Sequence, residues 1–420
     1  KKAIIGMEAW ISPFPPKRFN FKTRLREERI MSQSKFKKAS LLAGTALVAA
    51  GVMTAGTASA DGHAKVVSSG TDKTAMKIAG HVSRQITYMD DGTKRVRHSD
   101  SNFSSTRLVI TASGKINPDL KIGSKIETAF DDARNGAAGS KAEFDARSGN
   151  DVQTRKAEIY LTHSSLGKLE IGAGSMAADG ITELGNTPFW MLPGQIALQN
   201  SGAFRAVSAN GSDISEEVHD VFGQSDGLGR STRIRYNTPN IGGFVASIAH
   251  QDDQSYDMGL RYSGKAMDTK IKLGVGYSVD NGVTKVADTI HGDGNEHFGA
   301  GIALQHSSGL GVSYGIEYIN DTSRDDIRAN DPLFQHMQVS FKSKMNEMGS
   351  TQFIYEYIQH ENKQNNNDTA VAHTVGFAQN IDAAASEVGL RYSHMELDRD
   401  GSSFTNDDVD ALSLHLRMKF

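Results

Sequence analysis

The final stretch of the chain constrains the fold most, because apolar and polar residues alternate there without a break up to the last residue. The apolar phase consists of Leu412, Leu414, Leu416, Met418 and Phe420. The polar phase consists of Ser413, His415, Arg417 and Lys419. Since successive side chains of a β-strand point to opposite faces of a sheet, this stretch predicts a strand with one apolar face and one charged face.

The same alternation recurs along the chain at intervals of about 20 residues. It predicts sixteen strands, at about 76–89, 104–116, 119–131, 152–163, 167–174, 230–239, 243–252, 255–264, 269–280, 296–307, 310–320, 333–343, 350–360, 370–380, 386–396 and 408–420. Most are longer than the usual 5–6 residues or so and long enough to cross a bilayer at a tilt, which takes about 9–11. A soluble sandwich or barrel would also alternate. However, aromatic residues near strand ends would form the interfacial girdles of a membrane barrel; they are Tyr88, Tyr236, Tyr262, Tyr318, Tyr392 and Phe420. We therefore expect an all-β fold, a transmembrane antiparallel β-barrel of 16 strands in a single domain, 61–420.

The predicted connections alternate between short turns and longer acidic or Asn-rich loops. Outer-membrane barrels have short periplasmic turns and long external loops, so both chain ends are expected on the periplasmic side. One connection, 175–229, is about 55 residues long and contains Trp190 between Pro188 and Pro193. A connection of that length inside a compact domain is usually functional.

The first 60 residues are read as separate from the barrel. Lys35, Lys37 and Lys38 precede the apolar run 41–52, and Ala58-Ser59-Ala60 is a small-residue cleavage site. This order predicts a secretory signal peptide over 31–60, cleaved after Ala60. A transmembrane helix is the alternative, but Gly, Thr and Ala dominate the run and no stop-transfer charges follow it. Residues 1–30 precede Met31 and show neither helix nor strand periodicity, so we expect a disordered upstream extension there.

Charge and composition exclude several partners. Residues 1–60 hold 11 Lys and Arg against 3 Asp and Glu, so the remainder holds 35 against 46, a net charge of −11. An acidic chain of this kind is not expected to bind nucleic acid, and the balance weakly favours cations over anions. The chain has no Cys, which excludes disulfides. Its 14 His are scattered without metal-ligand spacing, so no metal or cofactor is expected, and Ca²⁺ on loop carboxylates has no support.

Three stretches carry a resemblance to a known family. Arg230 to Pro239, followed by Gly243-Phe244, resembles the R-x-x-x-[IV]-R-Y-[DN]-[ST]-P strand and turn of the Gram-negative general diffusion porins. Arg155 to Leu161, followed by Leu166 to Gly172, is similar to another strand-turn-strand unit of that family. The third stretch is the alternating terminal strand with Phe420, a form typical of outer-membrane proteins in general.

The resemblance implies a trimeric, sixteen-stranded channel in the outer membrane, with its third long loop folded into the lumen. That loop corresponds to 175–229, and its acidic candidates for the constriction are Asp179, Glu183, Asp213, Glu216 and Glu217, with Asp220 and Asp226 further along. Arg107, Arg155 and Arg230 match basic residues of the facing wall. The implied function is passive diffusion of small hydrophilic solutes and ions. The implied partners are a homotrimer, outer-membrane lipid and lipopolysaccharide, and the barrel-assembly machinery, which would read Phe420.

Some residues depart from the family pattern. His81 stands where many members have a lumen Lys, and the family's acidic loop tip is absent from 188–194. In the strand at 152–163, alternation places Arg155 on the same face as the apolar residues Ala157, Ile159 and Leu161. It places Lys156 and Glu158 on the opposite face. Either Arg155 points away from the lumen, or Lys156 and Glu158 lie in a subunit interface. A substrate-specific channel is the alternative function. An outer-membrane hydrolase with a Ser/His/Asx site, or an adhesin, is a weaker one, and no residue nominates a catalytic site.

Overall fold

The structure is a computed structural model, and it describes 66–68, 73–131, 151–188, 191–196, 203–207, 213–223, 226–251, 255–281, 284–286, 289–291, 295–320, 331–362, 368–399, 404–406 and 408–420. The described residues belong to one compact unit, Ser59–Phe420. The predicted upstream extension, the signal peptide and its cleavage site at Ala60 lie outside them.

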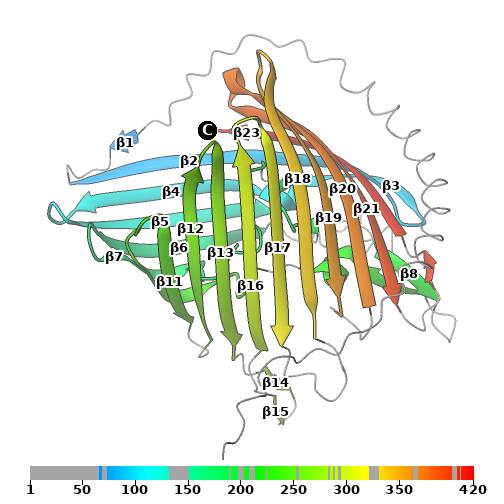
Figure 1. Cartoon of the computed structure of the whole chain (residues 1–420), viewed down its shortest axis with the longest axis horizontal. Helices are drawn as coiled ribbons and strands as arrows, with labels where there is room; N and C mark the ends of the chain where they lie inside the picture. Colours follow the sequence, from blue (N-terminus) through cyan, green and yellow to red (C-terminus); the bar gives the residue numbers. More distant parts are fainter. Residues whose placement is uncertain are drawn as a thin grey trace, which may run out of the picture. The chain divides into compact units, whose positions relative to one another are not determined.

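Sixteen strands close into one antiparallel barrel (Figure 1). They are β2 (Thr74–Asp90), β4 (Thr106–Lys115), β5 (Leu120–Asp131), β6 (Asp151–His163), β7 (Gly167–Ser175), β10 (Arg230–Asn237), β11 (Phe244–Gln251), β12 (Tyr256–Ala266), β13 (Thr269–Asp280), β16 (Asn295–His306), β17 (Leu310–Asn320), β18 (Leu333–Asn346), β19 (Gly349–Glu361), β20 (Asp368–Ile381), β21 (Ser386–Arg399) and β23 (Asp408–Lys419). The ring closes where β2 pairs with β23, with His81 opposite Lys419 and Asp90 opposite Asp410. The expected fold class and strand number are confirmed.

Shorter elements decorate the barrel. They are β1 (Val66–Ser68), β3 (Lys94–Asp100), the 3-10 helix η2 (Asn102–Ser104), β8 (Ala203–Val207), β9 (Asp213–Glu217), α3 (Val218–Phe222), β14 (Thr284–Val286), β15 (Thr289–His291), the 3-10 helix η6 (Asp382–Ala384) and β22 (Phe404–Asn406). β3 extends the wall beside the second half of β2, whose first half pairs with β4. Within the described part of the chain, no helix is long and apolar enough to span a membrane.

The two faces of the barrel wall follow the sequence alternation. In β23, Ser413, His415 and Arg417 are buried, whereas Met418 on the other phase is exposed. Large apolar side chains are exposed all round the ring, among them Ile126, Ile171, Leu260, Val275, Phe298 and Tyr355. We call the face with the buried, mainly polar residues the inner face. A barrel with exposed apolar side chains outside and polar ones inside suits lipid around it and water within it.

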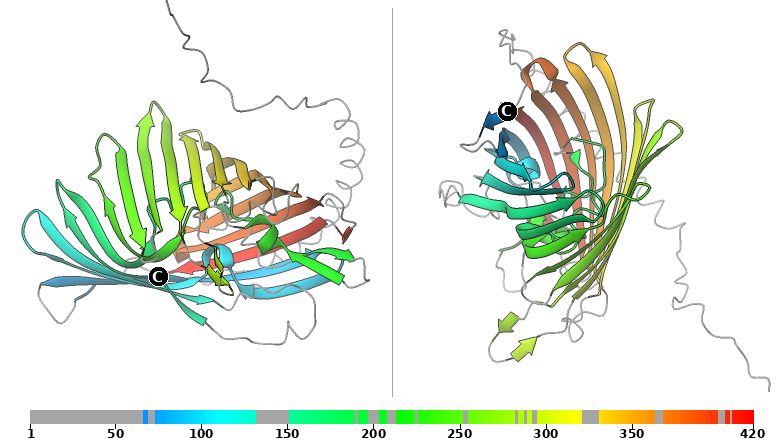
Figure 2. Two further views of the ribbon diagram at one scale, coloured as in Figure 1. Left: turned by 90° about the horizontal axis from the view of Figure 1, so that it is seen from below. Right: turned by 90° about the vertical axis from the view of Figure 1, so that its left-hand side faces the viewer.

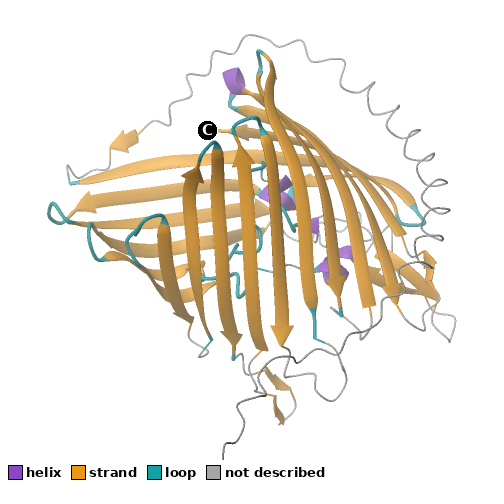
Figure 3. Cartoon of the chain, viewed as in Figure 1, coloured by secondary structure: helices purple, strands orange, loops and turns teal. Residues whose placement is uncertain are grey.

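The short turns gather at one end of the barrel, where the C-terminus also lies (Figure 3). A turn of this kind joins β16 to β17, where Gly309 has a φ of 96° and an added Cβ would meet the carbonyl oxygen of Lys342 at 2.0 Å. Glycine is required there because a side chain would clash in this left-handed conformation. The longest connection joins β7 to β10 and follows the end of β7 that lies away from its short turn. Figure 2 shows the strands from two further sides.

Candidate functional site: the inner wall and the connection between β7 and β10

The first part of this connection, 176–196, is described at 176–188 and 191–196, and these residues are bonded to side chains on the inner face. The Asp257 carboxylate accepts hydrogen bonds from the backbone N–H groups of Ala177 (2.8 Å) and Ala178 (2.7 Å). Arg261 donates to the carbonyl oxygens of Ala177 (2.6 Å) and Asp179 (2.7 Å). Both side chains come from the buried phase of β12. The start of the connection is therefore held by paired side chain-to-backbone bonds.

Four more inward-facing residues continue these anchors across the wall to β19. Lys272 donates to Gly185 O (2.7 Å), His336 to Thr182 O (2.7 Å) and Gln338 to Met191 O (2.8 Å), while Glu356 accepts from Gly194 N–H (2.7 Å). His336, Gln338 and Glu356 are all buried. Buried polar groups are costly unless they are paired, so these bonds favour one fixed path for the segment.

The second part of the connection fills the inner face with apolar side chains. β8 contributes Phe204, and α3 contributes Val218, Val221 and Phe222; all four are buried. They pack against inward-facing apolar residues, which are Met89, Phe334, Ile358, Ala370, Ala372, Met395, Leu397, Val409 and Ala411. β8 also pairs with β22, and Ala203 N–H donates to Asp91 (3.2 Å). The second part of the connection therefore packs as an apolar cluster against the wall.

The acidic candidates of the connection separate into two groups. Glu216 forms an ion pair with Arg399 at the end of β21 (3.0 Å), and Glu217 lies at the start of α3. Asp220 is exposed on α3. Asp213 belongs to β9, and the structure does not describe its side chain. Asp179 and Glu183 lie instead in the anchored segment 176–196, where Glu183 accepts a hydrogen bond from Gln195 (3.0 Å).

Asp226, near the end of the connection, is hydrogen-bonded to Asp179, near its start. Two carboxyl groups can share a hydrogen bond only when one of them carries a proton. Burial, followed by the negative charges of Glu183 and Asp179, raises the pKa of Asp226 well above its usual value. Glu317 of β17 lies beside the pair, and one of its oxygens accepts from Gly227 N–H (3.2 Å). The two ends of the connection therefore meet at a pair of acidic side chains, and burial favours the protonated form of Asp226.

The three predicted wall arginines lie in one electrostatic cluster. Arg107 on β4 and Arg155 on β6 both approach Glu127 on β5, at 3.6 Å and 3.1 Å. Arg230, at the exposed start of β10, is close enough to both to act on them electrostatically. Asp179 acts on Arg155 in the same way. The acidic start of the connection and this basic cluster therefore act on each other.

A β-bulge explains the disputed phase of β6. The register between β5 and β6 shifts after Glu127, which pairs with Lys156, so that Arg155 is the extra residue. Arg155 contacts Glu127, Lys156 Nζ contacts Ser175 Oγ (3.2 Å), and Glu158 contacts Arg233 (2.6 Å). All three are at least partly buried. Neither alternative drawn from strict alternation is therefore right: Arg155 does not point outward, and Lys156 and Glu158 do not lie on the outer face.

Several inward-facing charges were not among the predicted pore residues. Arg233 pairs with Glu158 and Arg235 with Glu170 (3.7 Å), while Arg417 pairs with Glu387. Arg391 is fully buried, 3.9 Å from Glu356 and over the ring of Phe103. Arg233 and Arg235 stand two residues apart in the 230–235 stretch, so their shared phase was a usable signal. The contact between Arg391 and Phe103 could not be predicted, because Phe103 lies in η2, far from Arg391 along the chain.

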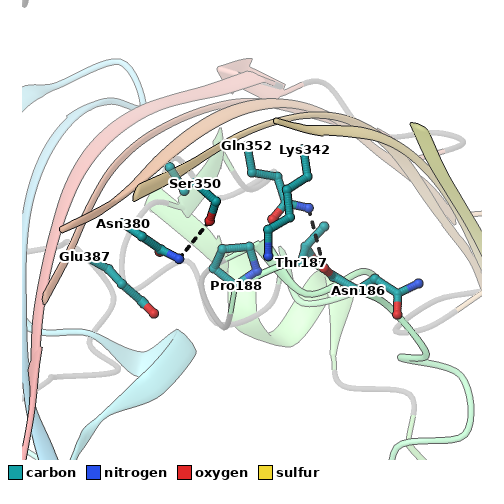
Figure 4. A pocket seen from close by; sticks show the side chains of 9 residues that line it. Asn186, Thr187, Pro188, Lys342, Ser350, Gln352, Asn380 and Glu387 are labelled. Carbon is teal, nitrogen blue, oxygen red and sulfur yellow. Dashed lines mark hydrogen bonds between the residues drawn. The ribbon is translucent and has the colours of Figure 1, made fainter. Parts of the chain in front are cut away.

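A cavity lies beside the anchored segment (Figure 4). Asn186, Thr187 and Pro188 form one side, and Lys342, Gln352 and Glu387 are among the wall residues opposite. Asn380 donates to Ser350 (2.9 Å) across its wall. The lining is polar and carries both signs of charge, which suits water and small solutes. In the described part of the chain, no group of three or more His, Asp or Glu side chains could hold a metal ion.

Phe420 lies next to the closure of the ring. Its backbone exchanges two hydrogen bonds with Gly80 (2.9 and 3.0 Å), and its side chain is exposed. The ring of Phe420 covers Gly80, where an added Cβ would come within 2.7 Å of it. Its predicted role in assembly depends on other proteins and stays a prediction.

Comparison with known proteins gives a consistent result. A family profile described as "Gram-negative porin" matches residues 43–416. No curated protein sequence matches the chain. The anion-selective porin from Comamonas acidovorans aligns with a TM-score of 0.56 at 13% identity, over 83% of this chain and 100% of that one.

Two other solved structures align with this chain at TM-scores close to that of the Comamonas acidovorans porin. Salmonella typhi OmpF, in complex with daunomycin, gives a TM-score of 0.52 at 12% identity, over 83% of this chain and 98% of that one. A trimer form of OmpT, an outer-membrane protein of Vibrio cholerae, gives 0.54 at 14% identity, over 83% and 100%. At these identities the likeness concerns the fold alone.

Proposed function

The chain belongs to the Gram-negative porin family and forms an outer-membrane diffusion channel, and we propose that residues 176–196 form its constriction. Small hydrophilic solutes and ions would cross down their gradients, with no chemistry performed on them. The observation that carries this proposal is the row of bonds from Asp257, Arg261, Lys272, His336, Gln338 and Glu356 to the backbone of that segment. A segment fixed on the inner face takes up part of the cross-section and leaves the rest to water.

The remaining cross-section would be bounded by a predominantly basic wall. Among the described inward-facing side chains of β2, β4 to β7, β10 and β23, Lys and Arg outnumber Asp and Glu. The basic set includes Lys77, Arg107, Lys125, Arg155, Lys156, Lys168, Arg233, Arg235, Arg417 and Lys419, and the acidic set is Glu127, Glu158 and Glu170. Rings of Lys and Arg are typical of anion-conducting pores.

We therefore propose a preference for small anions. The net charge of −11 after residue 60 favours cations, but that sum includes the external loops, whose charges lie outside the pore. Ion preference depends on charges near the permeating ion, because the Debye length is about 8 Å at physiological salt. The anion selectivity in the name of the Comamonas acidovorans porin supports the proposal by analogy.

The expected assembly is a homotrimer. The trimer form of OmpT supports it by analogy, as does the outer face of β2 to β7, where the exposed apolar residues are mostly aliphatic. They include Val82, Ile86, Ile122, Ile126, Ile159 and Ile171, with Phe130 as an aromatic exception. Exposed aromatic residues concentrate on β10 to β20, and they include Tyr236, Phe244, Phe298, Tyr314, Phe341 and Phe353. Aromatic girdles mark lipid contact, so the aliphatic side is the better candidate for subunit contact.

The other partners follow from the location in the outer membrane. Outer-membrane lipid and lipopolysaccharide would surround the aromatic side, and the assembly machinery would read the last strand with Phe420. Export would use the signal peptide at 31–60.

Conductance of the purified protein in planar bilayers tests the proposed function. We expect large ohmic steps that occur in threes, and a reversal potential in a KCl gradient that reports anion preference. Currents that saturate with one solute would favour the substrate-specific channel instead. A correctly folded protein that gives no conductance would refute both.

A further inference from the structure

This inference rests on the proposed constriction and concerns what sets its width. The segment 176–196 crosses the inner face at a place where glycines on neighbouring strands pair with one another. Gly259 on β12 pairs with Gly276 on β13, which pairs with Gly299 on β16. In a parallel row, Gly274 pairs with Gly301, which pairs with Gly315 on β17. We call these six residues the glycine track.

The segment lies in direct contact with the glycine track. A Cβ added at Gly301 would sit 2.1 Å from the carbonyl oxygen of Ile181, and one at Gly315 would sit 2.2 Å from that of Thr182. At Gly259 the nearest atom would be the carbonyl oxygen of Ala177, at 2.7 Å. These neighbours are backbone atoms, which cannot rotate away as the end of a side chain can. Glycine in a strand often marks a place where another backbone approaches closely.

The side chain of Ile181 fills the space left by the track. It is 1% exposed, and its Cδ1 atom would lie 2.8 Å from a Cβ at Gly276 and 3.1 Å from one at Gly259. The anchors on either side restrict the path of the segment, with Asp257 and Arg261 before Ile181 and His336 bound to Thr182 after it. Between them, only contact with the wall limits how closely the backbone approaches.

We propose that the glycine track sets the width of the channel, because the missing side chains decide how far residues 177–184 stand out from the wall. The wall itself cannot retreat, since each track strand is hydrogen-bonded on both sides. An alanine at Gly315 would have to move the Thr182 carbonyl from 2.2 Å to the 3.4 Å of ordinary contact, a shift of about 1.2 Å. Because the wall lies behind the segment, the shift is directed toward the pore axis.

Single-channel conductance and exclusion of polyethylene glycols of graded size test the proposal on the full-length protein. We expect Gly301→Ala and Gly315→Ala to lower conductance by about twofold and to exclude smaller polymers than wild type, since conduction through a narrow pore depends steeply on its diameter. Gly311→Ala is the matched control. It lies on the same strand and face as Gly315, but its Cβ would meet Ser340 Oγ and Gln305 Oε1, the ends of side chains that can rotate.

The outcomes separate this inference from the proposed function. If wild type conducts and Gly301→Ala and Gly315→Ala match it in conductance and polymer exclusion, the glycine track does not set the width. An equal loss in Gly311→Ala would also contradict the proposal. If wild type does not conduct at all, the proposed channel fails and the polymer test with it.

A rescue pair covers the case in which those variants fail to assemble. Gly276→Ala places its Cβ against Ile181 Cδ1, an atom that Ile181→Ala removes. The double variant should therefore conduct more than Gly276→Ala alone, a non-additive effect expected only of residues in contact. Additive losses would contradict the proposal.

Discussion

At the scale of single residues, Glu127 is the shared partner of the basic cluster. It is 6% exposed and lies within 4 Å of charged nitrogens of Arg107, Lys125 and Arg155. One carboxylate thus offsets part of the charge of three cations in the proposed pore wall. Because buried charges are costly without partners, Glu127 both holds the cluster together and limits its positive potential.

Replacing Glu127 with Gln should increase anion preference. The substitution keeps the shape of the side chain and removes the negative charge beside Arg107 and Arg155, so the local potential becomes more positive. We expect the chloride-to-potassium permeability ratio to rise by about twofold, measured as a reversal potential across a KCl gradient. Glu296→Gln is the control, since it removes the same charge beside the side chain of Tyr277, on the outer phase of β16. A shift toward potassium in Glu127→Gln would contradict the proposed role of the cluster.

The Asp179–Asp226 pair should make the attachment of the connection depend on pH. The pKa of Asp226 is raised, so the folded form holds its proton more tightly than a free chain would. The contact is therefore fully present below the ordinary Asp value near 3.8 and is lost as the pH rises through the raised pKa. Above it, Asp226 would carry its charge beside Asp179, Glu183 and Glu317, while Arg155, Arg235 and Arg261 would still attract Asp179.

Hydrogen exchange at the backbone N–H of Gly227, which donates to Glu317, and of Met176, which donates to Gly229 O, measures this dependence. After correction for the intrinsic rate, exchange in wild type should speed up as the pH rises through the raised pKa of Asp226. It should change little in Asp226→Asn, whose amide donates to Asp179 without titrating. Asp220→Asn, which alters an exposed acid on α3, should behave as wild type does. The same pH response in Asp226→Asn as in wild type would show that the pair is not responsible.

What the sequence could predict at this scale depended on whether the signal was local. Arg155 and Arg230 were named from short motifs and Arg107 from its place at the start of a predicted strand, and the structure brings them into one electrostatic cluster. The β-bulge at Arg155 was not predicted because Arg155-Lys156 contains no Gly or Pro to announce it. Strict alternation therefore could not place Arg155 and Lys156 on the same face. The pairing of Asp226 with Asp179 was beyond prediction, since nothing local links positions 47 residues apart.

At the scale of elements, β8 and α3 form an apolar layer against the barrel wall. Their partners Met395, Leu397, Val409 and Ala411 stand on the inner phase of β21 and β23. In the sequence, these residues appear only as apolar side chains on the otherwise polar phase of two strands. Their role is to pack against Phe204 and Phe222, which lie far away along the chain. The strands themselves were predictable because alternation is a local property, but what covers them was not.

Phe222→Ala should loosen this layer without dissolving the barrel. Phe222 is fully buried, and truncating a buried Phe to Ala costs about 3–5 kcal/mol. Because the loss falls on the connection, we expect faster hydrogen exchange and proteolysis within 203–223 and unchanged exchange in β12 and β13. His219→Ala alters an exposed residue of the same helix and should leave both unchanged. Equal protection of 203–223 in Phe222→Ala and wild type would mean that the apolar layer does not hold the connection.

At the scale of the whole molecule, the outer surface has an aliphatic side and an aromatic side. This difference predicts where subunits meet if the chain is a trimer. Ile126→Trp places a bulky ring on the aliphatic side, where it should prevent close packing and shift the protein from trimer to monomer. Val275→Trp makes the same change at a similarly exposed position on β13 and should leave the trimer intact. Light scattering of the detergent complexes distinguishes the two, and dissociation by Val275→Trp alone would place the interface on the other side.

The pairing of β2 with β23 also constrains the order in which the molecule can be made. β2 is among the first strands to be synthesised, yet its partner strand ends only at Lys419, more than 300 residues later. Until then the growing sheet has two open edges, which are liable to pair with other chains. Closing so long a loop is also slow. A chain that lacks β23 therefore cannot close its ring, so an intact final strand signals that every other strand of the barrel has already been made.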